Sequence, residues 1–179
     1  IAVPPLASYS DQLWDYWERN LDPDLHKDRS LGGAIGNKVV MITGASSGIG
    51  HAAAIKAAAA GAKVLLVARS QDKLETTREE IEAEGGEAHI HTCDLADPDD
   101  VERMGAEVLD QHGHVDVLVN NAGRSIRRSV ALSYDRFHDF ERTMQLNYFG
   151  SLKLILVLLP RMRERKSGHI INISSIGVQ

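Results

Sequence analysis

The sequence predicts an α/β fold in which helices cover both faces of a parallel sheet. From residue 38 onward, short apolar runs alternate with helical patterns, and this alternation is typical of parallel strands joined by right-handed crossovers. Runs such as Val64-Leu65-Leu66-Val67 contain no polar residue, which favours burial on both sides of the sheet. The first run leads directly into a glycine-rich turn over residues 43–50. Together these observations indicate a doubly wound sheet with a ligand site at the carboxyl ends of its strands.

Composition indicates a single globular domain of ordinary type. The chain has 179 residues, of which 43% are apolar and 25% are charged, enough for a sizeable core. A net charge of −5 argues against nucleic-acid binding through a basic surface. The single cysteine, Cys93, fits a reducing compartment. With no secretory signal and no apolar run long enough to span a bilayer, we expect a cytoplasmic protein without a transmembrane segment.

Residues 1–37 form an N-terminal extension ahead of the predicted domain, which covers residues 38–179. A short helix is expected over residues 11–21, with Ser10 as its cap and with both tryptophans, Trp14 and Trp17. This helix either packs on the domain as a clasp or serves as a docking segment or interdomain linker. A clasp is favoured because exposed tryptophans are unfavourable. The glycines of residues 32–37 are expected to form the turn into the first strand.

Strands and helices alternate in the order that a doubly wound sheet requires. Strands are expected over residues 38–43, 63–68, 88–92, 115–120 and 169–174. Helices are expected over residues 49–60, 71–84, 98–111, 134–146 and 148–164. Asp97 and Pro98 are the expected cap and first residue of the third of these helices. Residues that follow the strands are therefore the candidates for a ligand site.

The glycine-rich turn reads Thr43-Gly44-Ala45-Ser46-Ser47-Gly48-Ile49-Gly50. Strand, glycine turn and helix start, in this order, are the local pattern of a dinucleotide pyrophosphate site. Gly44 lets the chain turn off the strand, Gly48 removes a Cβ near the phosphates, and Gly50 lets the helix pack close to the sheet. The start of the helix then offers N–H groups and a positive dipole end to the anion. A flexible surface turn is the alternative, and the flanking strand and helix argue against it.

The spacing Thr-Gly-x-x-x-Gly-Ile-Gly resembles the cofactor turn of the short-chain dehydrogenase/reductase family. Four further motifs of that family follow in its order: Cys93-Asp94-Leu95, Asn120-Asn121-Ala122-Gly123, Asn147-Tyr148-Phe149-Gly150 and residues 168–175. The resemblance covers about residues 38–179. It implies a Rossmann-type doubly wound parallel sheet whose later strands are missing from this chain. It also implies an oxidoreductase that moves hydride between a nicotinamide cofactor and a small-molecule carbonyl substrate.

The resemblance implies a role for each matching residue. The implied cofactor contacts are Thr43, Gly44, Ser46, Ser47, Gly48, Ile49, Gly50, Arg69, Ser70, Asp94, Leu95, Asn121, Ala122 and Gly123. Asp94 would contact the adenine amino group, and the N–H of Leu95 would contact a ring nitrogen. Asn147 would bind a water of the proton relay, and Ser175 would hydrogen-bond the substrate carbonyl. The plainer alternatives are a helix-start role for Asp94, turn formation by residues 121–123 and capping by the serines.

The residues after the second strand predict the type of cofactor. An NAD site usually has a carboxylate here for the ribose 2′-hydroxyl, whereas this chain has Ala68 and Arg69. A guanidinium can pair bidentately with a 2′-phosphate, which a carboxylate would repel. We therefore expect NADP(H), with an ordinary surface arginine as the alternative.

The family's catalytic tyrosine and lysine, spaced Tyr-x-x-x-Lys, are not found in this sequence. None of its four tyrosines has a lysine four residues later. The expectation is that the chain is the N-terminal part of a longer enzyme domain, truncated before that motif. Because general acid catalysis contributes about 10²–10⁴-fold, residues 1–179 alone are expected to be inactive.

The substrate is suggested by two stretches, residues 17–25 and 137–147, which resemble the C-terminal reductase domain of two-domain bacterial fatty acyl-CoA reductases. This resemblance implies a fatty acyl-CoA or fatty aldehyde substrate and a role in lipid metabolism. Reduction of 3-oxoacyl thioesters or small ketones, and a non-catalytic NADP(H)-binding module, remain alternatives. A loop after the fourth strand contains Arg124, Arg127 and Arg128. These arginines either bind an anionic group of the substrate, or they belong to a solvated loop.

Two further groups of residues bear on partners and metals. The helix over residues 148–164 has a broad apolar face, and the resemblance implies that it builds a two-fold interface, so we expect a homo-oligomer. His89, His91 and Cys93 alternate along one strand and share a face. Side chains two apart on a strand rarely converge on one ion and no fourth ligand is evident, so no metal site is expected.

Overall fold

The structure is a computed structural model that describes residues 30–126 and 128–174. The predicted helix over residues 11–21, Arg127 and Ser175 lie outside these residues. From Leu31 onward the chain forms one compact unit built on a five-stranded parallel sheet, with strand order β3-β2-β1-β4-β5. The strands are β1 Val39–Thr43, β2 Lys63–Ala68, β3 Glu87–Thr92, β4 Val117–Asn120 and β5 His169–Asn172. This order confirms the predicted doubly wound α/β fold.

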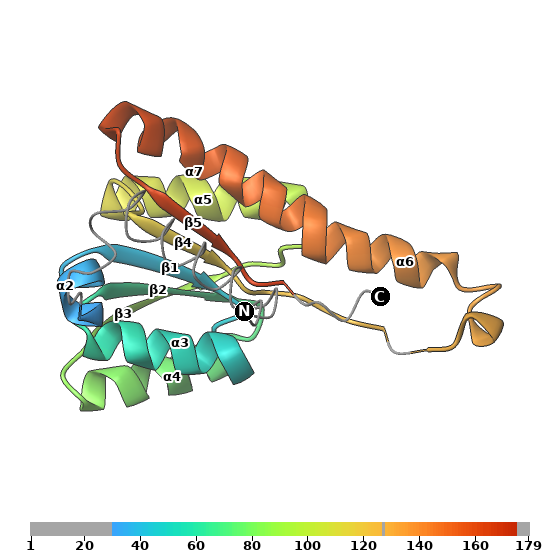
Figure 1. The fold of residues 1–179 in the computed structure, drawn as a ribbon, viewed down its shortest axis with the longest axis horizontal. Helices are drawn as coiled ribbons and strands as arrows, with labels where there is room; N and C mark the ends of the chain where they lie inside the picture. Colours follow the sequence, from blue (N-terminus) through green and yellow to red (C-terminus); the bar gives the residue numbers. More distant parts are fainter. Residues whose placement is uncertain (1–29, 127, 175–179) are drawn as a thin grey trace, which may run out of the picture. The chain divides into compact units, whose positions relative to one another are not determined.

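Helices cover both faces of the sheet (Figure 1). One face packs against α3 Gly48–Ala59 and α4 Gln71–Ala83, and the other against α5 Pro98–His112 and α7 Ser151–Arg165. Alternate residues of β1 supply both cores, because Met41 faces the α5 and α7 side while Val40 and Ile42 face the α3 and α4 side. Burial on both faces is the physical reason for the uninterrupted apolar strands.

The structure corrects two local predictions. Gly32 and Gly33 belong to a short helix, α2 Leu31–Ile35, so the turn into β1 is confined to Gly36 and Asn37. The expected break between two helices at Asn147 is instead continuous helix: α6 Phe137–Met144 leads through the π-helical turn η2 Gln145–Gly150 into α7. A π-turn adds a residue without ending the helix, which is why a poor helix former is tolerated here. A short 3₁₀ turn, η1 Val130–Leu132, precedes α6.

The predicted start of α5 is confirmed in detail. The carboxylate of Asp97 accepts hydrogen bonds from the N–H groups of Asp99 and Asp100, and Pro98 is the first helical residue. Within residues 30–126 and 128–174, no helix is long and apolar enough to cross a bilayer. Over the same residues, no group of three or more His, Cys, Asp or Glu side chains is arranged to hold a metal ion.

A pair of histidines, one buried and one half-buried, joins β3 to α5. Nε2 of His91, a residue that is only 6% exposed, lies 3.2 Å from Nε2 of His112 at the end of α5. His89 packs edge-on against the His112 ring, while its own Nε2 lies 2.9 Å from Glu87. Burial and the neighbouring His112 lower the pKa of His91 to about 4. At mildly acidic pH, His91 is therefore neutral in the folded chain but charged in the unfolded chain.

Acid should therefore destabilise the fold through this histidine pair. Below a pH of about 6.5, His91 is protonated in the unfolded chain but stays neutral in the folded chain. The free energy of unfolding therefore falls as the pH falls toward about 4. Between pH 7 and pH 5 we expect a loss of about 2 kcal/mol in the free energy of unfolding, measured by urea denaturation. His91→Leu should remove most of this slope, whereas His169→Gln, at an exposed position, should keep it. Equal slopes in wild type and His91→Leu would contradict the prediction.

Candidate functional site

The carboxyl ends of the first four strands surround a cleft of about 390 Å³. Its lining comes from the loops that follow β1, β2, β3 and β4 and from η2: Gly44, Ser46, Ser47, Ala68, Arg69, Ser70, Lys73, Cys93, Asp94, Leu95, Asn121, Ala122, Gly123 and Leu146. Ten of these residues are among the fourteen that the sequence predicts for the cofactor site. The structure thus brings together four segments that are distant in the chain.

The glycine turn has the backbone geometry that its sequence demands. Gly44 has a φ of +68°, in the left-handed region where side chains are strained. A Cβ on Gly50 would overlap the carbonyl oxygen of Gly44 and lie 2.5 Å from Nδ2 of Asn121. A Cβ on Gly48 would instead meet nothing within 4 Å, and Ile49 is exposed. No side chain caps the first turn of α3, so its N–H groups are left for an anion.

Thr43 ties the loops after β1 and β4 together. Its buried hydroxyl oxygen accepts hydrogen bonds from the backbone N–H groups of Asn121 and Ala122, both 3.0 Å long, and donates to the carbonyl of Val119 at 3.4 Å. In return, the side-chain amide of Asn121 donates to the carbonyl of Thr43 at 3.0 Å. The glycine turn and residues 121–123 therefore form one hydrogen-bonded unit, with both halves lining the cleft.

Arg69 lies at the rim of the cleft, with 75% of its side chain exposed. Its guanidinium is 3.9 Å from the carboxylate of Asp94, which follows β3 on the neighbouring segment. Lys73, in the first turn of α4, lines the same cleft, and sequence reasoning did not single it out. Arg69 lies before α4 begins, so no helical spacing links the two residues, and it is the packing of α4 that brings Lys73 to the cleft. The rim thus carries two cations.

Cys93 is buried at the base of the cleft beside Asp94. Burial, together with the negative charge of Asp100, raises the pKa of its thiol to about 12. The thiol is therefore protonated and unreactive at neutral pH. The side chain of Asp94 itself accepts a hydrogen bond from the N–H of Ala96 at 3.0 Å, which directs one carboxylate oxygen along its own turn.

Asn147 holds the loop that follows the Asn-Asn-Ala-Gly motif. Its side-chain oxygen accepts from the N–H of Arg124 at 2.8 Å, and its side-chain nitrogen donates to the carbonyl of Arg124 at 2.7 Å. The amide thus pairs with the backbone as a neighbouring strand would, from within the π-turn η2. Its expected contact with a relay water stays a prediction, as does the role of Ser175, which lies beyond the part of the chain that the structure describes.

The structure places Arg128 in an ion pair within the chain. Nη1 of Arg128 lies 2.6 Å from the buried carboxylate of Asp139, and Nε of Arg136 lies 2.7 Å from the same oxygen. These two cations hold the pKa of Asp139 well below its usual range. Arg128 thus takes part in an internal ion pair that fixes the loop ahead of α6. Because Asp139 is shared with Arg136, its single charge does not neutralise both arginines, and the expected contact of Arg128 with a substrate anion stays a prediction.

Comparison with known proteins identifies the family. The family model for short chain dehydrogenases matches residues 38–179. The chain belongs to the short-chain dehydrogenase family. Among curated relatives of this family, it is 60% identical to a fatty acyl-CoA reductase of Acinetobacter baylyi over 141 residues, covering 79% of this chain and 48% of that protein. It is 55% identical to an uncharacterised oxidoreductase of Mycobacterium tuberculosis over 167 residues, covering 92% of this chain and 49% of that protein.

Solved structures of the family share the fold. A metagenomic short-chain oxidoreductase in complex with NADP superimposes with a TM-score of 0.76 and 38% identity, covering 82% of this chain and 66% of that one. The chain spans about half the length of the curated relatives it matches. The short-chain dehydrogenase fold that the glycine turn and the four later motifs predict is therefore confirmed.

Proposed function

We propose that this chain is the cofactor-binding part of an NADP(H)-dependent short-chain oxidoreductase that reduces a carbonyl group. The observation that carries the proposal is the rim of the cleft, where Arg69 and Lys73 follow β2. In a dinucleotide fold the residues after the second strand are the ones expected near the ribose 2′-substituent. Two cations there favour a phosphate over a hydroxyl. Further support comes from similar family structures that were solved with NADP or NADPH.

The residues present fit such a dinucleotide. The first turn of α3 has no side-chain cap, and the space beside Gly48 is free of other atoms, so both can accommodate the pyrophosphate. The carboxylate of Asp94 can accept a hydrogen bond from the adenine amino group. When bound, the cofactor supplies or accepts the hydride. The chain's own residues would bind and orient the cofactor. Arg69 and Lys73 would pair with the 2′-phosphate, and residues 121–123, after β4, would form another part of the cleft wall. Asn147 braces that part of the wall through the backbone of Arg124. Ser175 would polarise the substrate carbonyl by donating a hydrogen bond.

For the substrate we propose a fatty acyl-CoA or fatty aldehyde, supported by 60% identity to the Acinetobacter fatty acyl-CoA reductase. Reduction of 3-oxoacyl thioesters or small ketones is the alternative within the same chemistry. A non-catalytic NADP(H)-binding module is the alternative outside it, since the chain contains no Tyr-x-x-x-Lys. A cytoplasmic location and a domain boundary near residue 37 belong to the proposal as well.

The test separates cofactor binding from turnover. The 179-residue chain should bind NADPH in a fluorescence titration yet show no NADPH oxidation with a panel of acyl-CoA, aldehyde and ketone substrates. It lacks the tyrosine that would donate the proton and the lysine that would lower the pKa of that tyrosine. The same panel run on the product of the whole parent gene should give turnover. Failure of the chain to bind NADPH would refute the cofactor assignment. Measurable turnover by the chain alone would refute its predicted inactivity.

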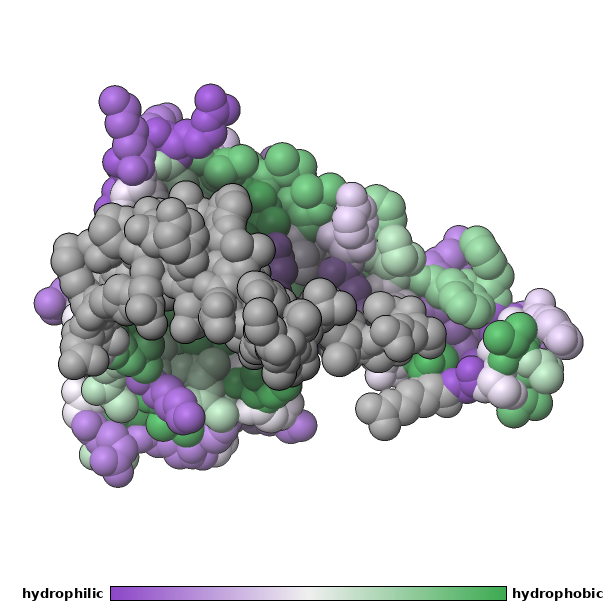
Figure 2. Space-filling model, in the orientation of Figure 1, coloured by the Kyte–Doolittle hydropathy of each residue, from purple (hydrophilic) through white to green (hydrophobic). Residues whose placement is uncertain are grey.

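We also propose that the protein is a homo-oligomer that associates through the outer face of the continuous helix. Large apolar side chains recur there every four residues, each between 37% and 57% exposed: Phe140, Met144, Tyr148, Leu152 and Leu156. A shallow hollow of about 570 Å³ between Leu156 and Glu164 extends this stripe, and Figure 2 shows hydrophobic surface over α7. An apolar stripe of this length is typical of a helix that packs against another helix.

Leu156→Arg should therefore convert the oligomer to a monomer, because an unpaired guanidinium would have to be buried at the centre of an apolar contact. Light scattering coupled to size-exclusion chromatography would measure the mass. Val130→Arg is the matched control, since Val130 is equally apolar and 75% exposed but lies on η1. A wild-type chain with a monomer mass would refute the proposed association.

A further inference from the structure

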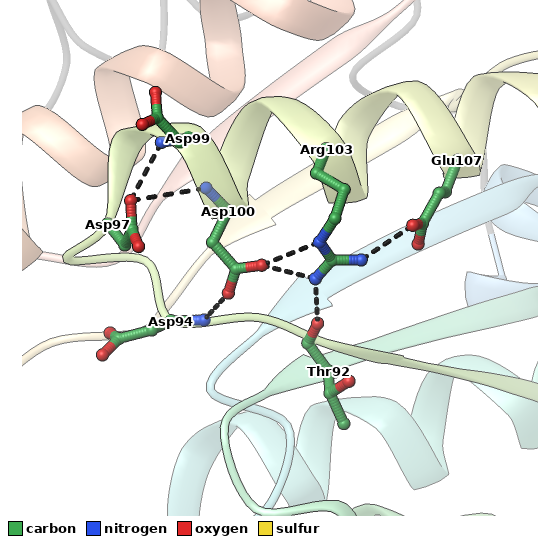
Figure 3. Close-up of polar contacts among 7 residues, drawn as sticks. All are labelled: Thr92, Asp94, Asp97, Asp99, Asp100, Arg103 and Glu107. Atoms are coloured by element: carbon green, nitrogen blue, oxygen red, sulfur yellow. Dashed lines mark hydrogen bonds and ion pairs between the residues drawn. The ribbon is translucent and has the colours of Figure 1, made fainter.

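An ion-pair network on α5 forms hydrogen bonds to the backbone at the end of β3, next to and including Asp94 (Figure 3). Oδ2 of Asp100 accepts a hydrogen bond from the backbone N–H of Asp94 at 2.7 Å. The other carboxylate oxygen of Asp100 receives Nε of Arg103 at 3.0 Å and also its Nη2. The same guanidinium donates to the carbonyl of Thr92 at 3.3 Å and to Glu107 at 2.8 Å. Asp100 and Arg103 therefore hold the backbone on both sides of Cys93.

This network is not needed to start the helix. Asp97 already caps α5 by accepting from the N–H groups of Asp99 and Asp100. The carboxylate of Asp100 points away from its own helix and toward the strand end, as Figure 3 shows. Its hydrogen bond to Asp94 and its contact with Arg103 lower the pKa of Asp100, so it is fully charged at neutral pH. A charged acceptor makes the bond to the Asp94 N–H a strong one.

The backbone that this network holds belongs to the segment that lines the cleft. Asp94 and Leu95 both line it. Four contacts hold Asp94: its N–H donates to Asp100, its carbonyl accepts from the N–H of Asp97 at 2.9 Å, one carboxylate oxygen accepts from the N–H of Ala96, and the other oxygen lies 3.9 Å from Arg69. Of these four partners, only Asp100 lies within a helix and is itself braced by a second side chain. A rotation of the Cys93–Asp94 peptide would move both Asp94 and the following residue, Leu95.

We propose that Asp100, braced by Arg103, is a positioning residue for recognition of the adenine base. It acts through Asp94 by fixing the Cys93–Asp94 peptide, which sets the position of Asp94 and of the following residue, Leu95, at the cleft. This inference rests on the proposed NADP(H) function and concerns its base selectivity.

The experiment compares two coenzymes that differ only at the base. The full chain is titrated with NADPH and with deamino-NADPH, in which hypoxanthine replaces adenine and the 6-amino donor is lost. Wild type should prefer NADPH by about tenfold, the effect of one hydrogen bond to a charged acceptor. Asp100→Ala should reduce this ratio to about twofold, because the Asp94 carboxylate is no longer aimed. Asp100→Asn, whose amide oxygen can still accept from Asp94, should keep most of it.

Asp99→Ala is the matched control, because Asp99 is an exposed carboxylate one residue earlier on the same turn, and it should leave the ratio unchanged. A merely structural role for Asp100 would weaken both coenzymes equally, so an unchanged ratio in Asp100→Ala would overturn the inference while leaving the proposed function intact. A wild-type chain that binds neither coenzyme would overturn both. If Asp100→Ala does not fold, Arg103→Gln, which removes the brace, should lower the same ratio, and an unchanged ratio there would equally overturn the inference.

Discussion

Replacing Arg69 by aspartate is expected to lower the affinity for NADPH about 100-fold and leave NADH binding within a few-fold of wild type. The change removes a guanidinium that can pair with the 2′-phosphate and places a carboxylate where that phosphate would lie. The new carboxylate would also stand beside Asp94, which is 3.9 Å from the Arg69 guanidinium, so two like charges would face the ligand. Dissociation constants for NADPH and NADH, from fluorescence titrations of wild type and variant, measure the effect.

The same experiment carries its own controls. Lys56→Asp makes the same change of charge on an exposed position of α3 that does not line the cleft, and it should leave the NADPH preference unchanged. Added salt should weaken NADPH binding by wild type more than by Arg69→Asp, because screening acts on the phosphate contact. A wild-type chain that binds NADH as tightly as NADPH would show that Arg69 is an ordinary surface arginine.

Replacing Gly150 by alanine is expected to destabilise the fold by roughly 3 kcal/mol. Gly150 ends η2 and packs directly on the loop after β3, where an added Cβ would overlap the carbonyl oxygen of Leu95 and lie 3.0 Å from its carbonyl carbon. The atoms it meets are backbone, which cannot move aside as a flexible side chain can. Alanine gains up to about 1 kcal/mol in helix propensity over glycine, and the overlap with the backbone outweighs that gain.

Urea denaturation of wild type and Gly150→Ala measures the loss of stability. Gly32→Ala is the matched control, because Gly32 is also helical and a Cβ there would meet the Ala60 carbonyl oxygen at 3.5 Å, an ordinary contact. Gly150→Ala should also weaken NADPH binding, because Leu95 lines the cleft and would be displaced. A variant as stable as wild type would mean that η2 and the loop after β3 separate easily.

Features set by neighbouring residues were predictable from the sequence. The sequence pattern predicts all five strands to within two residues at each end. For the central strands β1 and β2 the reason is burial on both faces, which requires uninterrupted apolar side chains. Asp97 and Pro98 predict the start of α5, since capping involves only the first turn. The glycines predict the turn after β1, because positive φ and close backbone approach are local demands.

Features that depend on distant contacts were not predictable in this way. Within the π-turn, the amide of Asn147 pairs with the backbone of Arg124, 23 residues earlier in the chain. Arg128 reads as a free cation in a loop, yet it pairs with Asp139 once α6 is in place. Lys73 becomes a candidate site residue only when the packing of α4 brings it to the cleft. In each case the sequence contains the residue, and the fold supplies its partner.

The hydrogen-bonded unit around Thr43 has a consequence for protein engineering. A cofactor-binding loop can be grafted from one protein scaffold onto another only if its buried hydrogen-bond partners are present there. Here, the hydroxyl of Thr43 accepts from the backbone N–H of Asn121, and the side-chain amide of Asn121 donates to the backbone carbonyl of Thr43. A graft of residues 43–50 alone would leave the Thr43 carbonyl without that amide, which is unfavourable in a buried place. The smallest unit that can be grafted therefore consists of two chain segments transferred together: the turn after β1 and residues 120–123.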